Sequence, residues 1–387
     1  IILYLFNMQL RDYQRQNASE ALDILRKYGM VYLQHQTRTG KSLTALTIAN
    51  DYEAKKVLFV TKKKAIQSVV EDMKAINYLF HLTVINYESM DKVGTDFDFV
   101  VLDEAHSLSA FPKMSNRTKY IKANFYNNPM VLMSGTPCAE SASQWFHQLH
   151  INRNSPFANY SNFYQWARTY VIVKDRHLGY AVVKDYSGAK VEAIELVINP
   201  IIHKFTQQQA GFVAKNEENI IEVMMQPITY HLINKLKSDK FYQGKTGSII
   251  ADSEVKLMSK LHQLASGTCK LEEGQSVIVD KTKINTIIDT FKDKKIAIFY
   301  YYIEERKMIM EALSDKATND INEFNSTDKW LVLQQYSGAM GINLSKADAL
   351  VFLNVGFSGT NYIQALDRMT TIDRQKNKVY FIHAINT

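Results

Sequence analysis

The sequence predicts an α/β protein with two lobes, each built on a parallel β-sheet, and a largely helical region between them. The first half of the chain alternates short apolar runs with helical stretches, and this alternation resumes after residue 218. Such alternation is typical of a parallel sheet covered by helices. Between these halves the segments are aromatic and polar. We therefore expect a first lobe at 8–152, a connecting region at 153–218 and a second lobe at 219–387.

Length and composition agree with more than one core. The chain has 387 residues, 46% of them hydrophobic, whereas single domains usually stop growing near roughly 250 residues. No apolar run approaches the roughly 20 residues that cross a bilayer, so no membrane partner is expected. Residues 1–7 are too short for a secretion signal and precede Met8, so we expect them to lie outside the natural reading frame.

Charge and cysteine content narrow the class of protein. A net charge of +7 and a pI near 9 favour a polyanionic partner such as nucleic acid. The two cysteines, Cys138 and Cys269, are too far apart in sequence for a zinc cluster or a disulfide scaffold. The histidines show no metal-ligand spacing. We expect a monomeric protein of the reducing cytoplasm.

The strands of each lobe are expected at short apolar runs, as in strands that are buried on both faces. In the first lobe these runs lie at 30–33, 56–61, 83–86, 97–103 and 130–134. In the second lobe they lie at 219–225, 295–301, 330–334, 349–354 and 378–383, with helices at 253–267, 283–292 and 303–313.

The strongest local signal is a phosphate-binding loop at 36–42, which follows a predicted strand and opens a predicted helix. In such a loop the backbone amides cradle the phosphates of ATP, the lysine neutralises the β and γ groups, and the hydroxyl holds Mg²⁺. Lys41 and Ser42 fit those two roles. The stricter pattern has a glycine where His35 stands, so the loop alone is a weak signal. The other loop candidates are Thr37, Thr39 and Gly40.

A second signal is a pair of adjacent carboxylates at the end of the apolar run 100–102. Asp103 is expected to hold Mg²⁺ through water, and Glu104 to polarise the attacking water. An isolated Asp-Glu pair is commonly a solvated strand end or a helix cap. Its spacing after the Gly-Lys-Ser turn makes an ATPase the preferred interpretation.

With these motifs in place, the chain resembles superfamily-two helicases, and more closely their Swi/Snf-like branch of double-stranded DNA translocases. The resemblance covers nearly the whole chain and implies two RecA-like lobes with ATP and Mg²⁺ in the cleft between them. It implies that Gln14, in Leu-Arg-Asp-Tyr-Gln, contacts adenine, and that Asn86 and Tyr87 lie along the nucleic-acid backbone. The residues implied in coupling the ATP site to the nucleic-acid track are His106, Ser134, Thr136 and Gln364.

Two further motifs of the family are matched in the second lobe. The segment 337–344 resembles the glycine-rich motif beside the DNA backbone. The resemblance implies that Ser337 and Asn343 bind nucleic acid and that Gly341 belongs to the ATP-binding site. The segment 364–368 matches the start of the last motif, so the resemblance implies that Arg368 reaches across the cleft to the γ-phosphate.

The sequence departs from the family at two positions. Thr371 stands where members carry a second arginine, the finger that steadies charge on the transferring phosphate. We expect Arg374 to take over that role; the alternative is a surface residue that contacts solvent or DNA phosphate. Arg38 stands where the Swi/Snf-like loop has glycine, and we interpret it as a solvent-facing residue.

Some features keep two interpretations. Lys62, the first of three lysines after a strand, is either a phosphate contact or a solvated cap. Phe163, Trp166 and Tyr170, at helical spacing, are interpreted as core residues rather than base-stacking platforms, because duplex tracking uses backbone contacts.

The sequence as a whole predicts a DNA-stimulated ATPase that moves along double-stranded DNA, with single-stranded DNA or RNA as possible partners. One alternative is a strand-separating helicase, which needs a wedge hairpin that the sequence does not make evident. Another is a nucleic-acid-binding scaffold with a decayed ATPase. Thr371 supports the scaffold, whereas intact Lys41, Asp103 and Glu104 argue against it.

Overall fold

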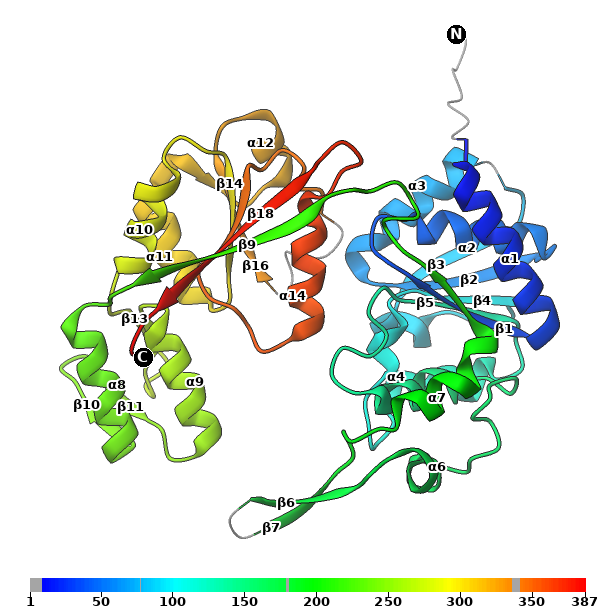
Figure 1. Cartoon of the computed structure of the whole chain (residues 1–387), viewed down its shortest axis with the longest axis horizontal. Coiled ribbons are helices and arrows are strands. Elements are labelled where there is room, and N and C mark those ends of the chain that lie inside the picture. Colours follow the sequence, from blue (N-terminus) through cyan, green and yellow to red (C-terminus); the bar gives the residue numbers. More distant parts are fainter. Residues whose placement is uncertain (1–8, 77, 179–180, 336–341) are drawn as a thin grey trace. The chain divides into compact units, whose positions relative to one another are not determined.

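The computed structural model describes residues 9–76, 78–178, 181–335 and 342–387. Ser337 and Gly341 fall outside these described ranges. The chain divides into two compact units, unit 1 ending at Gly211 and unit 2 beginning at Phe212. Each unit is built on a six-stranded parallel sheet flanked by helices (Figure 1), which confirms the predicted α/β class with two parallel-sheet lobes.

The sheet of unit 1 has the strand order β3-β2-β4-β5-β1-β8, and every neighbouring pair is parallel. Its strands are β1 (Met30–His35), β2 (Lys56–Thr61), β3 (His81–Asn86), β4 (Phe99–Leu102), β5 (Met130–Met133) and β8 (Ile202–Phe205).

Helices cover both faces of this sheet because successive strand residues point to opposite faces. Met30 and Tyr32 belong to one core cluster, whereas Val31 and Leu33 belong to the other. The helices are α1 (Asp12–Tyr28), α2 (Lys41–Asp51) and α3 (Ile66–Ile76) beside the second cluster, and α4 (Asn116–Phe125), α5 (Trp145–Leu149), α6 (Phe163–Tyr170) and α7 (Val191–Ile198) beside the first. Short 3₁₀ turns are η1 (Lys63–Ala65), η2 (Tyr87–Lys92), η3 (Ala105–Leu108), η4 (Ala142–Gln144) and η5 (Asn199–Ile201).

The interval 153–218 contains more strand than the sequence led us to expect. Besides α6 and α7 it holds an antiparallel hairpin, β6 (Lys174–Leu178) with β7 (Ala181–Asp185), which projects from unit 1 in Figure 1. It also holds β8, which pairs with β1 at the edge of the sheet. Trp166 is fully buried, as its interpretation as a core residue requires. The lobe boundaries at 152 and 218 stay predictions.

The sheet of unit 2 has the order β15-β16-β14-β17-β18-β9, again with parallel neighbours. Its strands are β9 (Lys215–Val223), β14 (Ile296–Tyr300), β15 (Ala317–Thr318), β16 (Trp330–Gln334), β17 (Ala349–Phe352) and β18 (Lys376–Ala384). The helices are α8 (Pro227–Asp239), α9 (Glu254–Ala265), α10 (Thr282–Phe291), α11 (Ile303–Leu313), α12 (Ile321–Ser326) and α14 (Gly359–Leu366), with 3₁₀ turns η6 (Ser314–Lys316) and η7 (Asp367–Met369).

A small separate core in unit 2 lies beneath α8 and α9. Two antiparallel pairs contribute to it: β10 (Phe241–Gln243) with β11 (Ser248–Ile250), and β12 (Thr268–Lys270) with β13 (Ser276–Ile278). Within the described ranges, no helix has the length and apolar character needed to span a membrane.

Candidate active site

The phosphate loop of unit 1 connects the end of β1 to the start of α2. Gly40 has φ +80°, and a Cβ there would lie 2.0 Å from Nε2 of Gln14, so both the backbone and the close approach require glycine. This contact places the buried Gln14 against the loop. Arg38 also has a positive φ, +63°, which explains why glycine suits this position in the Swi/Snf-like pattern.

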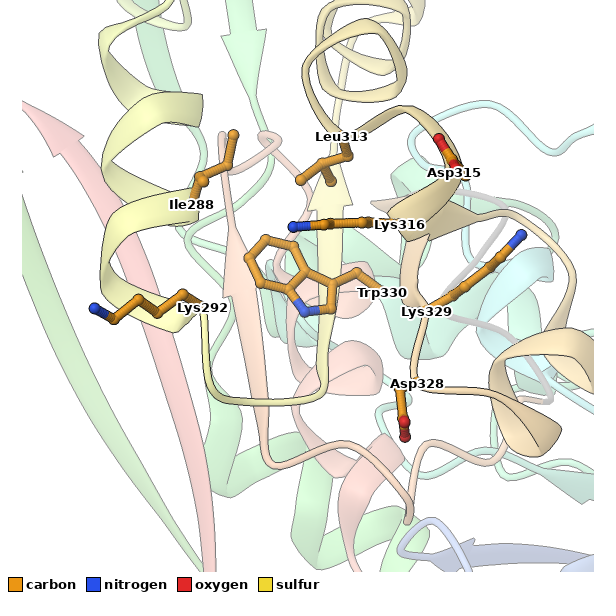
Figure 2. A pocket seen from close by; sticks show the side chains of 8 residues that line it. All are labelled: Ile288, Lys292, Leu313, Asp315, Lys316, Asp328, Lys329 and Trp330. Atoms are coloured by element: carbon orange, nitrogen blue, oxygen red, sulfur yellow. The ribbon is translucent and has the colours of Figure 1, made fainter.

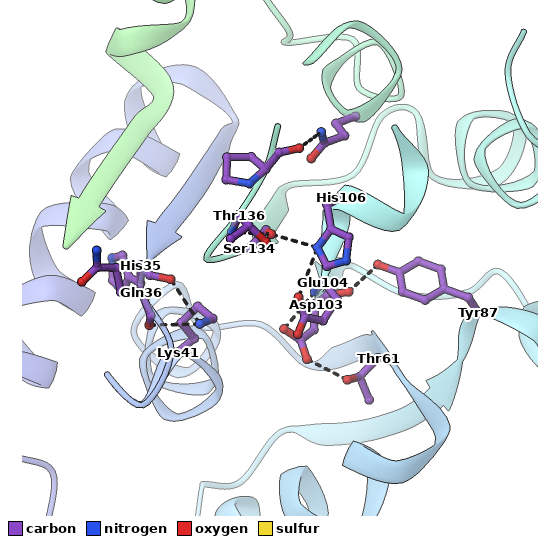
Figure 3. Close-up of polar contacts among 12 residues, drawn as sticks. His35, Gln36, Lys41, Thr61, Tyr87, Asp103, Glu104, His106, Ser134 and Thr136 are labelled. Atoms are coloured by element: carbon purple, nitrogen blue, oxygen red, sulfur yellow. Dashed lines mark hydrogen bonds and ion pairs between the residues drawn. The ribbon is translucent and has the colours of Figure 1, made fainter. Parts of the chain in front are cut away.

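The Lys41 side chain folds back onto the start of the phosphate loop. Its Nζ donates to the carbonyl oxygens of His35 and Gln36, at 3.1 Å each (Figure 3). The Thr39 hydroxyl also donates to the Gln36 carbonyl, at 2.8 Å. Because Lys41 and Ser42 begin α2, backbone amides of that helix start complement a phosphate anion.

The carboxylate pair follows β4 at the same edge of the sheet. Asp103 accepts hydrogen bonds from the Thr61 hydroxyl at 2.7 Å and from the Glu104 amide at 2.9 Å (Figure 3). The Tyr87 hydroxyl donates to the Asp103 carbonyl oxygen at 2.6 Å. Glu104 has φ +50°, an uncommon conformation for a residue other than glycine. Two hydrogen bonds therefore hold the Asp103 carboxylate, and a third holds its backbone carbonyl.

The two carboxyl groups have opposite pKa shifts. Burial, followed by the neighbouring charge of Glu104, raises the pKa of Asp103. Burial opposes ionisation of Glu104 too, but a hydrogen bond from His106 and the positive charges of Lys62, His106 and Lys41 outweigh it and lower its pKa. The lowered pKa keeps the Glu104 carboxylate ionised.

A histidine connects this pair to the segment after β5. Nδ1 of His106 lies 3.2 Å from Oε2 of Glu104 and 3.0 Å from Oγ of Ser134. Ser134 Oγ accepts from the Thr136 amide at 3.2 Å. Glu104, His106, Ser134 and Thr136 therefore form one connected group (Figure 3), as a coupling role requires.

The chemistry of these donors fits Mg²⁺ carried by a nucleotide. Asp103 and Ser42 offer oxygen atoms, the ligands that Mg²⁺ prefers, and a nearby cation would stabilise the charged form of the partly buried Asp103 carboxylate. The described residues contain no cluster of three His, Cys, Asp or Glu that could hold a metal ion alone. Phosphate oxygens and water would have to complete the coordination of a Mg²⁺ ion held by Asp103 and Ser42.

The predicted nucleic-acid residues of unit 1 have different surroundings. Tyr87 is buried, with its hydroxyl on the Asp103 backbone, so its side chain faces the core. Asn86 is held by Glu88 at 2.9 Å. Lys62 is half-buried, and its charge acts on Glu104.

In unit 2, backbone contacts hold the arginine segments. The Arg368 carbonyl accepts from the Leu344 amide at 2.9 Å. The Arg374 guanidinium donates to the carbonyls of Ala347 at 2.7 Å and Ser345 at 3.0 Å, and more weakly to two others. Those bonds must break before Arg374 can act as a finger, so its proposed role stays a prediction that this geometry does not favour.

Among the other predicted site residues of unit 2, two lie within the described residues. Asn343 is exposed, and its side chain accepts from the Ser345 amide at 3.1 Å. Gln364 is buried on α14. Ser337 and Gly341 lie outside the described residues.

A buried polar chain behind the phosphate loop was missed by the sequence analysis. Nε2 of His203, on β8, lies 2.9 Å from the Glu20 carboxylate of α1, and Nδ1 of the same ring lies 2.8 Å from Nε2 of His35. Burial lowers the pKa of His35 to about 3, with help from His203 and Lys41. No sequence motif marks these partners, because β8 brings them together.

The segment after β8 also supports the loop. The Gln207 amide donates to Oε1 of Gln36 at 2.7 Å, and its side chain donates to the carbonyl and hydroxyl oxygens of Thr37 at 3.1 Å each. The loop is therefore held by α1, which precedes it closely, and by β8 and the segment after β8, which are distant in sequence.

Comparison with known proteins identifies a family. The model of the SNF2-related domain matches residues 32–273, which is more than half of the chain. Human chromodomain-helicase-DNA-binding protein 1 is 21% identical over 330 residues, covering 77% of this chain and 19% of that protein. The human SWI/SNF-related matrix-associated actin-dependent regulator of chromatin subfamily A member 1 is 21% identical over 350 residues, covering 83% and 33%. The chain thus spans a third or less of these relatives.

Two solved structures are also similar. A Sulfolobus solfataricus SWI2/SNF2 ATPase core in complex with dsDNA has 16% identity and a TM-score of 0.46, covering 100% of this chain and 90% of that one. The Pyrococcus furiosus Hef helicase domain has 16% identity and a TM-score of 0.49, covering 98% and 96%.

Proposed function

The chain belongs to the SNF2-related family, which confirms the resemblance to Swi/Snf-like proteins, and on this premise we propose that it hydrolyses ATP to move along double-stranded DNA. The observation that carries the proposal is the group of side chains at the carboxyl edge of the unit 1 sheet. Lys41, the Asp103–Glu104 pair and Ser134 each follow a strand of that sheet, and His106 connects the last two sites.

In the proposed reaction Lys41 leaves its two carbonyl contacts and binds the phosphates, with the start of α2 supplying amides. Ser42 and Asp103 would hold Mg²⁺, which supplies positive charge to the phosphate oxygens when bound. Glu104 polarises the attacking water, and its lowered pKa keeps the carboxylate ionised for that role. Gln14, packed on the loop, is positioned to contact the base.

The proposed coupling passes through the His106 connection. A change in the charge near Glu104 alters its contact with His106, which also meets Ser134 at 3.0 Å. The Thr136 amide donates a hydrogen bond to Ser134 Oγ and so extends the connection. We propose duplex DNA as the track because the chain carries a net charge of +7 and belongs to this family. Lys62, Asn86, Ser337 and Asn343 are the proposed DNA contacts.

Displacement of a third strand from a DNA triplex tests movement directly. We expect ATP-dependent release when duplex DNA flanks the triplex, and none with Glu104→Gln protein, which keeps the phosphate loop but loses the carboxylate that polarises the water. Active ATP hydrolysis without triplex release would contradict movement while leaving the ATPase intact.

A second candidate function, strand separation, is favoured by the projecting β6–β7 hairpin. The hairpin pairs Arg176 with Val183 and His177 with Val182, and both valines are about half exposed. Such an exposed ribbon is the kind of element that a wedge needs. Unwinding of a forked DNA or RNA duplex that is lost when residues 174–185 are replaced by a short Gly-Ser turn would establish this candidate instead.

A further inference from the structure

A cavity of unit 1 lies among α4, α5 and the start of α6, with a volume of about 380 Å³. Lys113, Lys119 and Lys122 line it, together with His147 and His150. None of the described residues that line it is Asp or Glu. No residue of the phosphate loop or of the carboxylate pair belongs to the lining, so the cavity is separate from the candidate active site.

The positive charge in this cavity has no acidic partner. Nε2 of His150 donates to the Tyr160 carbonyl at 2.7 Å, which leaves Nδ1 to accept from Nζ of Lys122 at 3.0 Å. Lys122 is therefore bound to a neutral ring. None of the ion pairs among the described residues includes Lys113, Lys119 or Lys122.

The pKa shifts agree with this geometry. Burial lowers the pKa of Lys122. Burial, followed by the positive charge of Lys122, lowers the pKa of His150 to about 4. Burial is the main cause of both shifts, because it disfavours the charged form of each group, and an anion in the cavity would favour the charged forms.

The backbone around the cavity also suits an anion. Asn162 caps α6 by accepting from the Gln165 amide at 3.0 Å, and Phe163 begins the helix at the cavity wall. The start of a helix carries partial positive charge. His147, nearly fully buried, donates from Nε2 to the Pro112 carbonyl at 3.1 Å and so holds the loop that carries Lys113.

A cavity of similar size in unit 2 shows that volume alone does not create this environment. It measures about 400 Å³ and is lined by Lys292, Lys316 and Lys329 (Figure 2). Asp315 and Asp328 line it too, and Lys329 is paired with Glu323 at 2.8 Å. Carboxylates thus balance much of its charge, in contrast to the cavity of unit 1.

We propose that the cavity of unit 1 binds a phosphate group, held by Lys113, Lys119, Lys122 and the start of α6. The phosphate belongs either to a small phosphorylated molecule, for which the volume suffices, or to the backbone of a nucleic acid. The chemistry is the same in both cases: several ammonium groups around one compact anion.

Calorimetric titration with inorganic pyrophosphate tests the site in full-length Lys41→Ala protein, whose phosphate loop lacks its lysine. We expect one binding site that weakens at least about tenfold in the added pair Lys119→Gln and Lys122→Gln, because charged hydrogen bonds are lost. Glutamine keeps an N–H donor for His150. Lys292→Gln with Lys316→Gln, in the balanced cavity, is the matched control and should leave the affinity unchanged.

A parallel titration with a short DNA duplex identifies the source of the phosphate. Weaker pyrophosphate binding with unchanged duplex affinity assigns a small phosphorylated ligand, whereas weaker duplex binding assigns a backbone phosphate. If the lysine pair changes neither affinity, the proposal is wrong. Should Lys122→Gln lower the thermal midpoint, the exposed pair Lys113→Gln and Lys119→Gln decides the same question.

Discussion

The candidate site of unit 1, at the carboxyl edge of its sheet, and the arginine segments of unit 2, which come before β18, are organised differently. In unit 1 the motif side chains bind one another directly, as in the contacts from Thr61 to Asp103 and from His106 to Ser134. In unit 2 the arginine segments are held by backbone carbonyls, most clearly around Arg374. Because the unit 1 motifs directly follow buried strands, the sheet register fixes their side chains. The comparison indicates that direct side-chain contacts organise the candidate site of unit 1, whereas backbone contacts set the positions of the candidate arginines of unit 2.

The largest effect is expected from changes in the unit 1 site. Lys41→Ala and Glu104→Gln should each lower ATP hydrolysis by about 100-fold or more, because each removes a group that acts on the transferring phosphate or its water. Glu104→Gln should still bind ATP, measured with a fluorescent nucleotide. Lys63→Ala, an exposed lysine nearby, is the control and should retain parent activity. Turnover of Glu104→Gln within a few-fold of the parent would exclude Glu104 as the residue that polarises the attacking water.

A smaller effect is expected from Arg374 in unit 2. Arg374→Ala should lower turnover about tenfold and also lower the free energy of unfolding by about 2–3 kcal/mol, because the guanidinium donates to several backbone carbonyls. Arg374→Lys should recover part of both. If Arg374 were the arginine finger, Arg374→Ala would lower turnover at saturating DNA, and its denaturation curve would match that of the parent protein.

The smallest effect concerns the buried histidine behind the phosphate loop. The pKa of His35 is about 3 when folded, below its ordinary value of 6.5, so below pH 6.5 only the unfolded chain takes up this proton. The free energy of unfolding should therefore fall by about 1.4 kcal/mol per pH unit from this residue as the pH decreases from 6.5 towards 3.

Urea denaturation of parent and His35→Asn proteins at pH 6.5 and 5 measures this contribution. The stability lost between the two pH values should be smaller by about 2 kcal/mol in the variant. Equal losses in both proteins would show that His35 does not titrate in this way.

The sequence predicted the strands that form continuous apolar runs. The run 56–61 coincides with β2, since Val57 to Val60 are buried on both faces. In contrast, β8 contains His203 and Lys204 and pairs with β1 far away in sequence, so its short polar run gave no strand signal. The β6 strand, whose charged residues 174–176 are exposed, was missed for a similar reason.

The same distinction applies to the candidate site. Motifs within one continuous segment, such as the loop containing Lys41 and the pair Asp103–Glu104, could be read directly. The contact between His35 and His203 depends on the pairing of β8, which no local pattern reveals. Tyr87 was expected along the nucleic acid, but its neighbours fold so that its hydroxyl reaches the Asp103 backbone. Side-chain direction at the end of β3 could not be inferred from the motif.

Steady-state ATP hydrolysis with no nucleic acid, duplex DNA, single-stranded DNA and RNA tests the central claim most directly. We expect duplex DNA to give the greatest stimulation, with little sequence preference. Stimulation should weaken steeply as salt rises, since phosphate contacts dominate affinity. Equal stimulation by RNA and duplex DNA would contradict a motor that moves along double-stranded DNA. So would a rate of ATP hydrolysis that none of the three nucleic acids changes.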